Sequence, residues 1–289
     1  MEFPCRRGIL GASMPELPEI EALKRNLSPR LEGHRLVSVR LLHARPCRPA
    51  TPAEVEGQLR GLRLHRLGRR AKYLVFRWEG GDSVPSPLLL HLGMTGSLAF
   101  STTEPKPSRH VVARMEWDHG FLSFEDPRRF GRFTTDPSAL DRLGPEPLSP
   151  EFAPEVLSRI GNSRQPIKVR LMDASLLAGI GNIYASEILH RAGISPRRRT
   201  DRIRDAEWPL LHEAVRGILE EAVRRNVRAH EAGISPYYHE AGDRGTWPED
   251  ASPFRVYDRA DEPCSRCGAR IRRCDQAGRS TYWCPGCQS

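Results

Sequence analysis

Two pairs of cysteines near the end of the chain constrain its fold more than any other feature of the sequence. Cys264 and Cys267 form one C-x-x-C pair, Cys284 and Cys287 form the other, and residues 268–283 separate them. Four thiolates at this spacing can surround one Zn²⁺ ion in a tetrahedron without an open coordination position. We therefore predict one structural zinc ion, held by a segment too short to fold without the metal.

The residues between the two pairs predict a β-hairpin. Its arms are residues 270–273 and 279–283, and its turn lies around residues 276–278. The hairpin is rich in arginine, which suits contact with nucleic acid, although a solvated charged face would have the same composition. Cys274 lies between the pairs, and we interpret it as a bystander and not as a metal ligand.

The overall charge also favours an anionic partner. The chain of 289 residues has 45 lysines and arginines against 36 aspartates and glutamates, and its net charge is +9. An excess of this sign is typical of proteins that bind polyanions. No apolar run reaches the ~20 residues of a membrane span, and residues 1–13 lack the apolar core of a signal peptide. We therefore expect a cytoplasmic protein with no membrane partner.

The length predicts about two domains, and the first combines one helix with short strands. Ile20, Leu23, Leu27 and Leu31 recur at helical spacing, and Gly33 ends this helix. Apolar runs of β type follow at residues 36–42, 73–78, 88–92, 111–117 and 121–124. Short strands separated by Gly, Pro and Ser clusters indicate a β-sandwich or barrel.

The pattern changes at residues 144–154, a proline-rich stretch that we interpret as a linker. Helical periodicity then covers residues 155–160, 167–177, 183–192 and 205–228, whereas residues 229–253 predict a long loop. A glycine turn at residues 178–182 opens directly into a helix, so its N–H groups either bind an anion such as phosphate or only connect two elements. The expected domains are residues 14–144, 145–253 and 254–289.

The segment at residues 14–21 reads M-P-E-L-P-E-I-E. If the mature polypeptide began after Met14, Pro15 would present a secondary amine beside the carboxylates of Glu16 and Glu19. An α-amino group has a reference pKa of about 7.7–8.0, so part of it is neutral and nucleophilic at physiological pH. Its attack on a sugar C1′ would give an iminium cation that acts as an electron sink. The same residues also suit an ordinary helix N-terminus.

Five sequence blocks stand in order along the chain. They are M-P-E-L-P-E at 14–19, R-R-A-K-Y at 69–73, H-L-G-M-T-G-S at 91–97, D-P-R-R-F-G at 126–131 and G-I-G-N-I-Y-A-S-E at 179–187. With the cysteine module, they resemble the formamidopyrimidine-DNA glycosylase and endonuclease VIII family of base-excision repair enzymes, and more closely its formamidopyrimidine branch. The resemblance implies an α+β fold: an N-terminal helix plus β-sandwich, a helical helix-two-turn-helix domain and a C-terminal zinc-finger β-hairpin. It also implies that damaged double-stranded DNA lies across the cleft between the two domains.

The resemblance implies catalytic roles for five residues. Pro15 would be the nucleophile that forms a Schiff base with the sugar, Glu16 would donate or shuttle the proton, and Glu19 would support the amine or the sugar. Lys72 would act in β-elimination and Arg279 in δ-elimination. The guanidinium fork of Arg279 suits two phosphate oxygens better than it suits proton donation, so we favour phosphate binding for this residue.

DNA contacts are implied as well. An enzyme that extrudes its target nucleotide must fill the space left behind. Met94, Arg128 and Phe130 match the family's inserted side chains, although Met94 and Phe130 would also suit an ordinary core. The further implied contacts are His91, Lys168, Asn182 and Tyr257.

The resemblance thus predicts a monomeric, nucleoid-associated enzyme, a bifunctional DNA glycosylase and AP lyase for oxidised purines. Residues 1–13 would turn the Pro15 nitrogen into an amide, so we expect them to be absent from the mature protein. If they are retained, the alternative is a catalytically dead zinc-bearing DNA-binding protein. Residues 229–253 lack the family's glycine–threonine run, and residues 108–110 keep only part of a His-Asp-His motif. Oxidised pyrimidines therefore stay open as an alternative substrate class.

Overall fold

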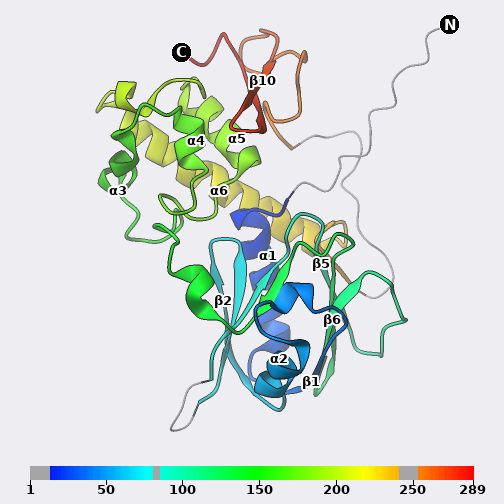
Figure 1. The fold of residues 1–289 in the computed structure, drawn as a ribbon. Helices are drawn as coiled ribbons and strands as arrows, with labels where there is room; N and C mark the ends of the chain where they lie inside the picture. The colour runs from blue at the N-terminus through cyan, green and yellow to red at the C-terminus, as the bar shows by residue number, and fades with distance from the viewer. Residues whose placement is uncertain (1–13, 81–84, 241–252) are drawn as a thin grey trace, which may run out of the picture.

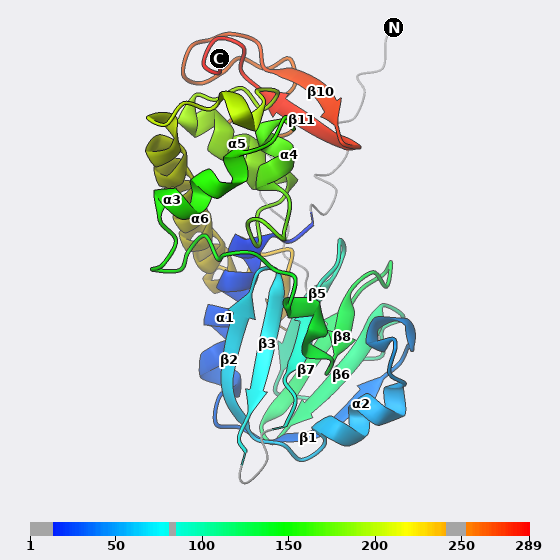
Figure 2. The same cartoon turned by 60° about the vertical axis from the view of Figure 1, so that its left-hand side comes forward.

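The computed structural model describes residues 14–80, 85–240 and 253–289. A β-rich domain occupies one end of the molecule, a helical domain lies above it, and a small hairpin module sits on the helices (Figure 1). Helix α1 (Leu17–Leu31) lies between the two domains, and the long helix α6 (Glu207–Glu231) extends from the helical domain to α1 (Figure 2). The predicted α+β class is confirmed.

The β-rich domain is a sandwich of two sheets. One sheet has the order β1 (Leu36–Leu41), β6 (Val111–Trp117), β7 (Gly120–Glu125), β5 (Ser97–Ser101) and β9 (Tyr238–Glu240). The other has the order β2 (Leu64–Arg70), β3 (Tyr73–Trp78), β4 (Leu88–His91) and β8 (Arg132–Thr134). All pairings are antiparallel except that of β9 with β5. Short elements complete the domain: α2 (Pro52–Leu59), η1 (Arg45–Cys47) and η2 (Pro137–Leu140).

Helix α1 belongs to the cores of both domains. Ile20, Leu23, Leu27 and Leu31 form the predicted apolar stripe, and all four are buried in the core of the sandwich. Leu17, at the first turn, is buried instead in the core of the helical domain. Each buried aliphatic side chain contributes about 1.5–3 kcal/mol. The start of α1 is therefore fixed against both domains.

The helical domain contains α3 (Pro154–Ser158), η3 (Arg159–Gly161), α4 (Ile167–Leu171), α5 (Asn182–Ala192), η4 (Thr200–Arg202) and α6. The predicted helix at 167–177 is wrong beyond Leu171. The chain turns there because the Asp173 carboxylate accepts hydrogen bonds from the backbone N–H and the hydroxyl of Ser175, a local alternative to helical bonds.

The predicted loop at 229–253 is wrong in its first half. Helix α6 continues to Glu231, and β9 then adds a parallel strand to the edge of β5 in the other domain. This pairing depends on a distant strand, so local periodicity does not reveal it. Residues 241–252 lie outside the described residues, as does the predicted extension at 1–13.

The proline-rich stretch before the helical domain is held by both neighbours. The Gly144 N–H donates to the Ala174 carbonyl, and the Glu146 side chain binds residues of the β2–β3 turn. Its interpretation as a simple linker therefore misses specific contacts to both domains.

The C-terminal module contains the predicted hairpin. Strands β10 (Arg272–Gln276) and β11 (Arg279–Trp283) pair antiparallel, with Gln276 opposite Arg279 at the turn. The module is attached to the end of α5, since the Gln288 side chain donates to the Ile194 carbonyl at 2.9 Å. Within the described ranges, no helix combines the length and hydropathy needed to cross a bilayer.

Candidate active site at the start of helix α1

Glu16 places the start of α1 against the start of α5. Its carboxylate accepts hydrogen bonds from the backbone N–H groups of Gly181 at 2.6 Å and Ile183 at 3.0 Å. These are donors at a helix N-terminus, where negative charge is stabilised. The predicted anion-binding turn is thus filled by the chain's own carboxylate, so a phosphate cannot use these two donors at the same time.

Glycines are required at this contact. A Cβ atom on Gly181 would lie 2.4 Å from the Glu16 Cδ atom, which is too close for any two carbon atoms that are not bonded. A Cβ atom on Gly179, whose φ is +91°, would lie 2.8 Å from the Leu17 Cβ atom. The G-I-G sequence therefore allows α1 to approach α5 closely.

The Glu16 carboxyl group lies in an environment suited to proton transfer. Only 2% of the residue is exposed, and burial raises its pKa above the ordinary value, although Lys72 and the α5 N–H groups act in the opposite direction. A hypothetical Cβ atom on Gly181 would also lie 2.6 Å from the Lys72 Nζ atom. The Lys72 side chain and a carboxyl group of raised pKa thus flank the same point, next in sequence to the buried Pro15.

Glu19 connects three helices. Its carboxylate accepts hydrogen bonds from the Glu16 N–H at 2.9 Å, from the Tyr184 hydroxyl and from the Asn226 amide at 3.0 Å. Burial raises the pKa of Glu19, and the same environment raises the pKa of Tyr184 well above its usual range. Because its two oxygens hold the start of α1 against α5 and α6, the Glu19 carboxylate orients the residues next to Pro15.

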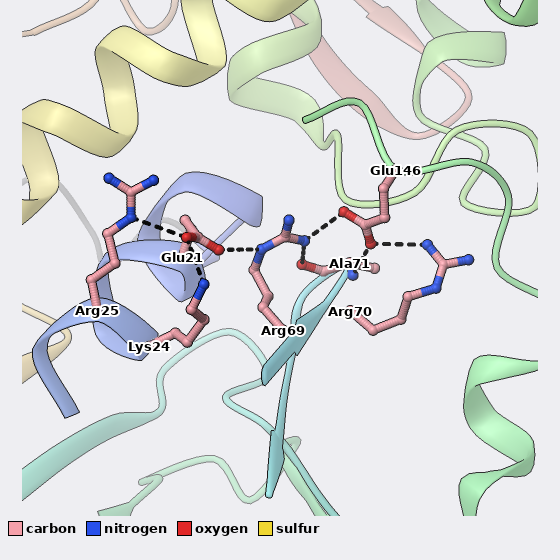
Figure 3. A network of polar contacts seen from close by, with 7 residues as sticks. All are labelled: Glu21, Lys24, Arg25, Arg69, Arg70, Ala71 and Glu146. Atoms are coloured by element: carbon pink, nitrogen blue, oxygen red, sulfur yellow. Dashed lines mark hydrogen bonds and ion pairs between the residues drawn. The ribbon is translucent and has the colours of Figure 1, made fainter. Parts of the chain in front are cut away.

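A polar network fixes the turn that carries Lys72 (Figure 3). Glu146 accepts hydrogen bonds from the Ala71 N–H at 2.5 Å, from Arg69 at 2.7 Å and from Arg70 at 2.9 Å. Arg69 also pairs with Glu21 of α1 at 3.0 Å. The network joins α1, the β2–β3 turn and the stretch before the helical domain.

Lys168 is buried beneath the zinc hairpin. Its ammonium group donates to the Asn182 side chain at 2.5 Å, to the Thr281 hydroxyl at 2.8 Å and to the Ser280 carbonyl at 3.1 Å. An ammonium group has three donors, so all three are used within the protein. Burial, with a smaller effect from Arg279, lowers the pKa of Lys168 to about 8. In this arrangement Lys168 links α4 to α5 and β11.

Glu187 of α5 holds the chain that enters the C-terminal module. It accepts hydrogen bonds from the backbone N–H groups of Arg255, Val256 and Tyr257 at 2.8–2.9 Å. Burial raises the pKa of Glu187 despite these three donors. The Tyr257 side chain is in turn hydrogen-bonded to Asn182, at the first position of α5.

Met94, Arg128 and Phe130 lie on two adjoining loops that share Asp126. This buried carboxylate accepts hydrogen bonds from the Thr95 hydroxyl at 2.5 Å and from the N–H groups of Arg128 at 3.2 Å and Gly131 at 2.8 Å. The loops touch closely, since a Cβ atom on Gly93 would lie 2.7 Å from the Gly131 nitrogen.

The side chains on these loops differ in exposure. Phe130 is 42% exposed, and the guanidinium groups of Arg128 and Arg45 lie 4.6 Å and 5.0 Å from its ring centroid. Met94 is half-buried. A partly uncovered phenyl ring between two cations is not a core residue, so the core alternative is wrong for Phe130.

His91 is the last residue of β4, directly before the loop that carries Met94. Its Nδ1 atom accepts a hydrogen bond from the Gly93 N–H at 3.0 Å, in the first of the two loops. Burial, followed by the charges of Lys72 and Arg132, lowers the pKa of His91 to about 4. The ring is therefore neutral at physiological pH.

Three family models match the chain in order. Residues 14–133 match the formamidopyrimidine-DNA glycosylase N-terminal domain, residues 143–232 the formamidopyrimidine-DNA glycosylase H2TH domain, and residues 261–289 the zinc finger found in FPG and IleRS. A formamidopyrimidine-DNA glycosylase of Dechloromonas aromatica (strain RCB) is 40% identical over 285 residues, which cover 95% of this chain and 100% of the relative. The chain belongs to the formamidopyrimidine-DNA glycosylase family.

Solved structures of the formamidopyrimidine-DNA glycosylase family share this fold. The MutM (FPG) protein of Thermus thermophilus is 36% identical with a TM-score of 0.77, and the match covers 95% of this chain and 98% of that one. A Lactococcus lactis glycosylase, solved in complex with DNA that contains an AP site, is 29% identical with a TM-score of 0.79 and coverages of 95% and 100%. The fold that the resemblance implied is confirmed.

The zinc site of this glycosylase family member has the expected geometry. The four Sγ atoms of the cysteine pairs lie within 4.8 Å of one another, with 3.3 Å between Cys267 and Cys284 and 3.9 Å between Cys264 and Cys287. Zinc–sulfur bonds of about 2.3 Å in a tetrahedron place sulfur atoms about 3.8 Å apart. The four side chains therefore fit one structural Zn²⁺ ion, and Cys274 is not part of the cluster.

The glycosylase fold brings the predicted site residues together in two groups. Around the start of α1 and α5 lie Pro15, Glu16, Glu19, Lys72, Lys168, Asn182, Tyr257 and Arg279, and on the two loops of the β domain lie Met94, Arg128 and Phe130. Sequence reasoning missed the buried carboxylates of Asp126 and Glu187 and the partly buried carboxylate of Glu146, which orient these residues. Asp126 is the first residue of the block at 126–131 and Glu187 the last residue of the block at 179–187, so a carboxylate at the edge of a block is the signal that could have found them.

Proposed function

We propose that this chain is a bifunctional DNA glycosylase and AP lyase that removes oxidised purines from double-stranded DNA. The observation that carries the proposal is the buried Glu16 carboxyl group, held at the start of α5 beside Lys72 and adjacent to Pro15. A nucleophile, a proton donor and a cation at one point provide the groups that glycosidic cleavage and elimination need.

The proposed reaction begins at the Pro15 nitrogen. Its lone pair attacks C1′ of the damaged nucleotide, the bond from C1′ to the base breaks, and the base leaves with the bonding electrons and takes up the proton that the Pro15 nitrogen loses. Glu16 supplies a proton as the sugar ring opens, which a raised pKa favours. The resulting iminium makes the C2′ proton acidic. Loss of this proton to a base expels the 3′-phosphate in β-elimination, and loss of the C4′ proton then expels the 5′-phosphate in δ-elimination. Lys72 assists these eliminations, and Arg279 binds phosphate beside them.

The nucleophile requires that the mature protein begin at Pro15. In support, the N-terminal family model starts at Met14, and removal of that methionine would free the proline nitrogen. With residues 1–13 attached, the same nitrogen is an amide without a basic lone pair, and catalysis by this route stops.

Two observations support duplex DNA with oxidised purines as substrate. A Lactococcus lactis variant was solved with DNA that contains Fapy-dG, and a MutM relative with DNA that contains carbocyclic 8-oxo-G. In this chain, Phe130 is exposed beside Arg128, on a loop that adjoins the loop of Met94, which suits insertion at the position of an extruded nucleotide. We infer that the enzyme works in the cytoplasm on nucleoid DNA.

The test compares two forms of the same chain on lesion-bearing duplexes. Protein that starts at Pro15 should cleave oligonucleotides with 8-oxoguanine or formamidopyrimidine and form a covalent adduct under borohydride. Protein that retains residues 1–14 is the matched control and should bind DNA but form no adduct. Equal activity of both forms would reject the proline mechanism, and preferred cleavage of oxidised pyrimidines would reject the substrate class.

A further inference from the structure

Two histidines and an aspartate meet where β1 begins and β6 ends. Leu36 pairs with Trp117, so residues just beyond this pair face one another across the sheet. The backbone fixes them there, because the Asp118 N–H donates to the Arg35 carbonyl at 3.0 Å and the Arg35 N–H donates to the Asp118 Oδ2 atom at 3.0 Å. His34 precedes Arg35, and His119 follows Asp118 in the β6–β7 turn.

The three side chains converge on one point. The Nδ1 atoms of His34 and His119 lie 2.8 Å and 3.0 Å from the same atom, Asp118 Oδ1, and the ring centroids are 3.7 Å apart. The three donor atoms lie within 4.8 Å of one another. Ligands at about 2.0–2.2 Å from a zinc ion are themselves about 3.0–3.5 Å apart, so this arrangement needs only small shifts to admit a cation.

The surroundings leave the cluster open to an ion. The side chains of His34, His119 and Asp118 are 39%, 30% and 42% exposed. The Nε2 atom of His119 is buried, so only the Nδ1 atom of this ring can reach an added ligand. A metal needs only the Nδ1 lone pair, and solvent supplies the remaining coordination positions.

We propose that His34, Asp118 and His119 form a second metal site, separate from the four-cysteine zinc site, for a divalent transition ion such as Zn²⁺. Two imidazole nitrogens and one carboxylate oxygen are ligands typical of this class, whereas Mg²⁺ and Ca²⁺ prefer oxygen alone. The bound ion ties the segment that follows α1 to the β6–β7 turn. In Figures 1 and 2, β1 lies at the opposite end of the molecule from the hairpin of β10.

Calorimetric titration of the zinc-loaded protein tests the site, since its cysteines are already occupied. Added Zn²⁺ or Ni²⁺ should give one further saturable binding event per chain, and added Mg²⁺ should give none. His119→Ala and Asp118→Asn should weaken this event at least tenfold, while the tightly bound zinc content and the thermal melting curve stay unchanged. The matched control is His43→Ala, a half-buried histidine of the same domain, which should bind like the parent protein.

Each other result overturns the proposal. Absence of a second event would show that the three side chains form only a hydrogen-bonded cluster. An event that persists in Asp118→Asn, or that falls equally in His43→Ala, would show dispersed surface binding. If His119→Ala does not fold, Asp118→Asn decides, because it preserves the size of the side chain.

Discussion

The Glu146 carboxylate accepts a 2.5 Å hydrogen bond from the backbone N–H of Ala71. Ala71 has a φ of +50°, a left-handed conformation that costs a residue with a Cβ atom about 1–2 kcal/mol. Glu146 precedes α3, the first helix of the helical domain, whereas Ala71 precedes Lys72 in the β2–β3 turn. One carboxylate therefore stabilises a strained turn and sets the position of Lys72 relative to both domains.

Replacing this carboxylate should affect stability and catalysis together. We expect Glu146→Gln to lower the free energy of unfolding by about 1–3 kcal/mol, because the partly buried Arg69 loses a charged partner. Strand cleavage should slow by roughly tenfold as Lys72 loses its fixed position. Urea unfolding and single-turnover cleavage of a lesion duplex measure the two effects.

The control for Glu146 is an exposed ion pair in the same domain. Glu79 lies 3.7 Å from Arg63, with both side chains more than half exposed. Glu79→Gln should change stability by less than about 1 kcal/mol and leave cleavage unchanged. Similar losses in both variants would contradict a specific role for Glu146.

One methyl group added at Gly181 should reduce activity by moving Glu16, and the same change at Gly57 serves as the control. The new Cβ atom would lie 2.4 Å from the Glu16 Cδ atom, so Gly181→Ala should displace this carboxyl group and reduce lesion cleavage at least tenfold. Gly57→Ala, in α2, has nothing within 4 Å of the new atom and should stabilise the protein by about 0.5–1 kcal/mol with full activity. Full cleavage by Gly181→Ala would show that the Glu16 position is unimportant.

Phe130 should matter for DNA and not for stability. Since its ring is 42% exposed, Phe130→Ala should change the free energy of unfolding by less than about 0.5 kcal/mol. Binding to a lesion duplex should weaken by roughly tenfold, because an apolar wedge is lost. Leu210→Ala, at a residue of α6 that is 56% exposed, serves as the control and should bind normally. Unchanged binding by Phe130→Ala would remove this residue from the DNA interface.

The sequence predicted the parts of this fold that local patterns encode. The two cysteine pairs led to the zinc hairpin, and the stripe of Ile20, Leu23, Leu27 and Leu31 led to α1. The sequence did not predict strand β2, because only Leu64 and Leu67 of this strand are fully buried. It did not predict β9, because this strand depends on pairing with β5. Periodicity indicates which face of one helix or strand is buried, but it does not indicate which distant segment pairs with that element.

The sequence predicted which residues belong to the candidate site, but it did not predict the hydrogen bonds that hold them in place. Blocks such as G-I-G-N-I-Y-A-S-E indicated Asn182 and the glycines, yet they did not reveal that Glu16 occupies the N–H groups of Gly181 and Ile183. Nor did they reveal that all three donors of Lys168 bind within the protein. The first fact arises where the start of α1 meets α5, and the second where α4 meets α5 and β11, and these elements are far apart in sequence.

Acid should destabilise the protein partly through His230. Burial lowers the pKa of this histidine to about 4, below the ordinary 6.5, so the unfolded chain binds more protons between these values. Stability should therefore fall as pH drops from 6.5 to 4, with a slope from this group of up to about 1.4 kcal/mol per pH unit. His230→Gln should flatten the profile from urea unfolding over this range, whereas His43→Gln should not. Parallel profiles for all three proteins would contradict the prediction.

The most direct test of the central claim is the position of the covalent bond to the damaged sugar. Protein that begins at Pro15 is trapped on a lesion duplex with borohydride, digested and sequenced by tandem mass spectrometry. The sugar remnant should be attached to the nitrogen of Pro15 at the N-terminus. A remnant attached to Lys72 or to any other lysine would show that another amine performs the chemistry.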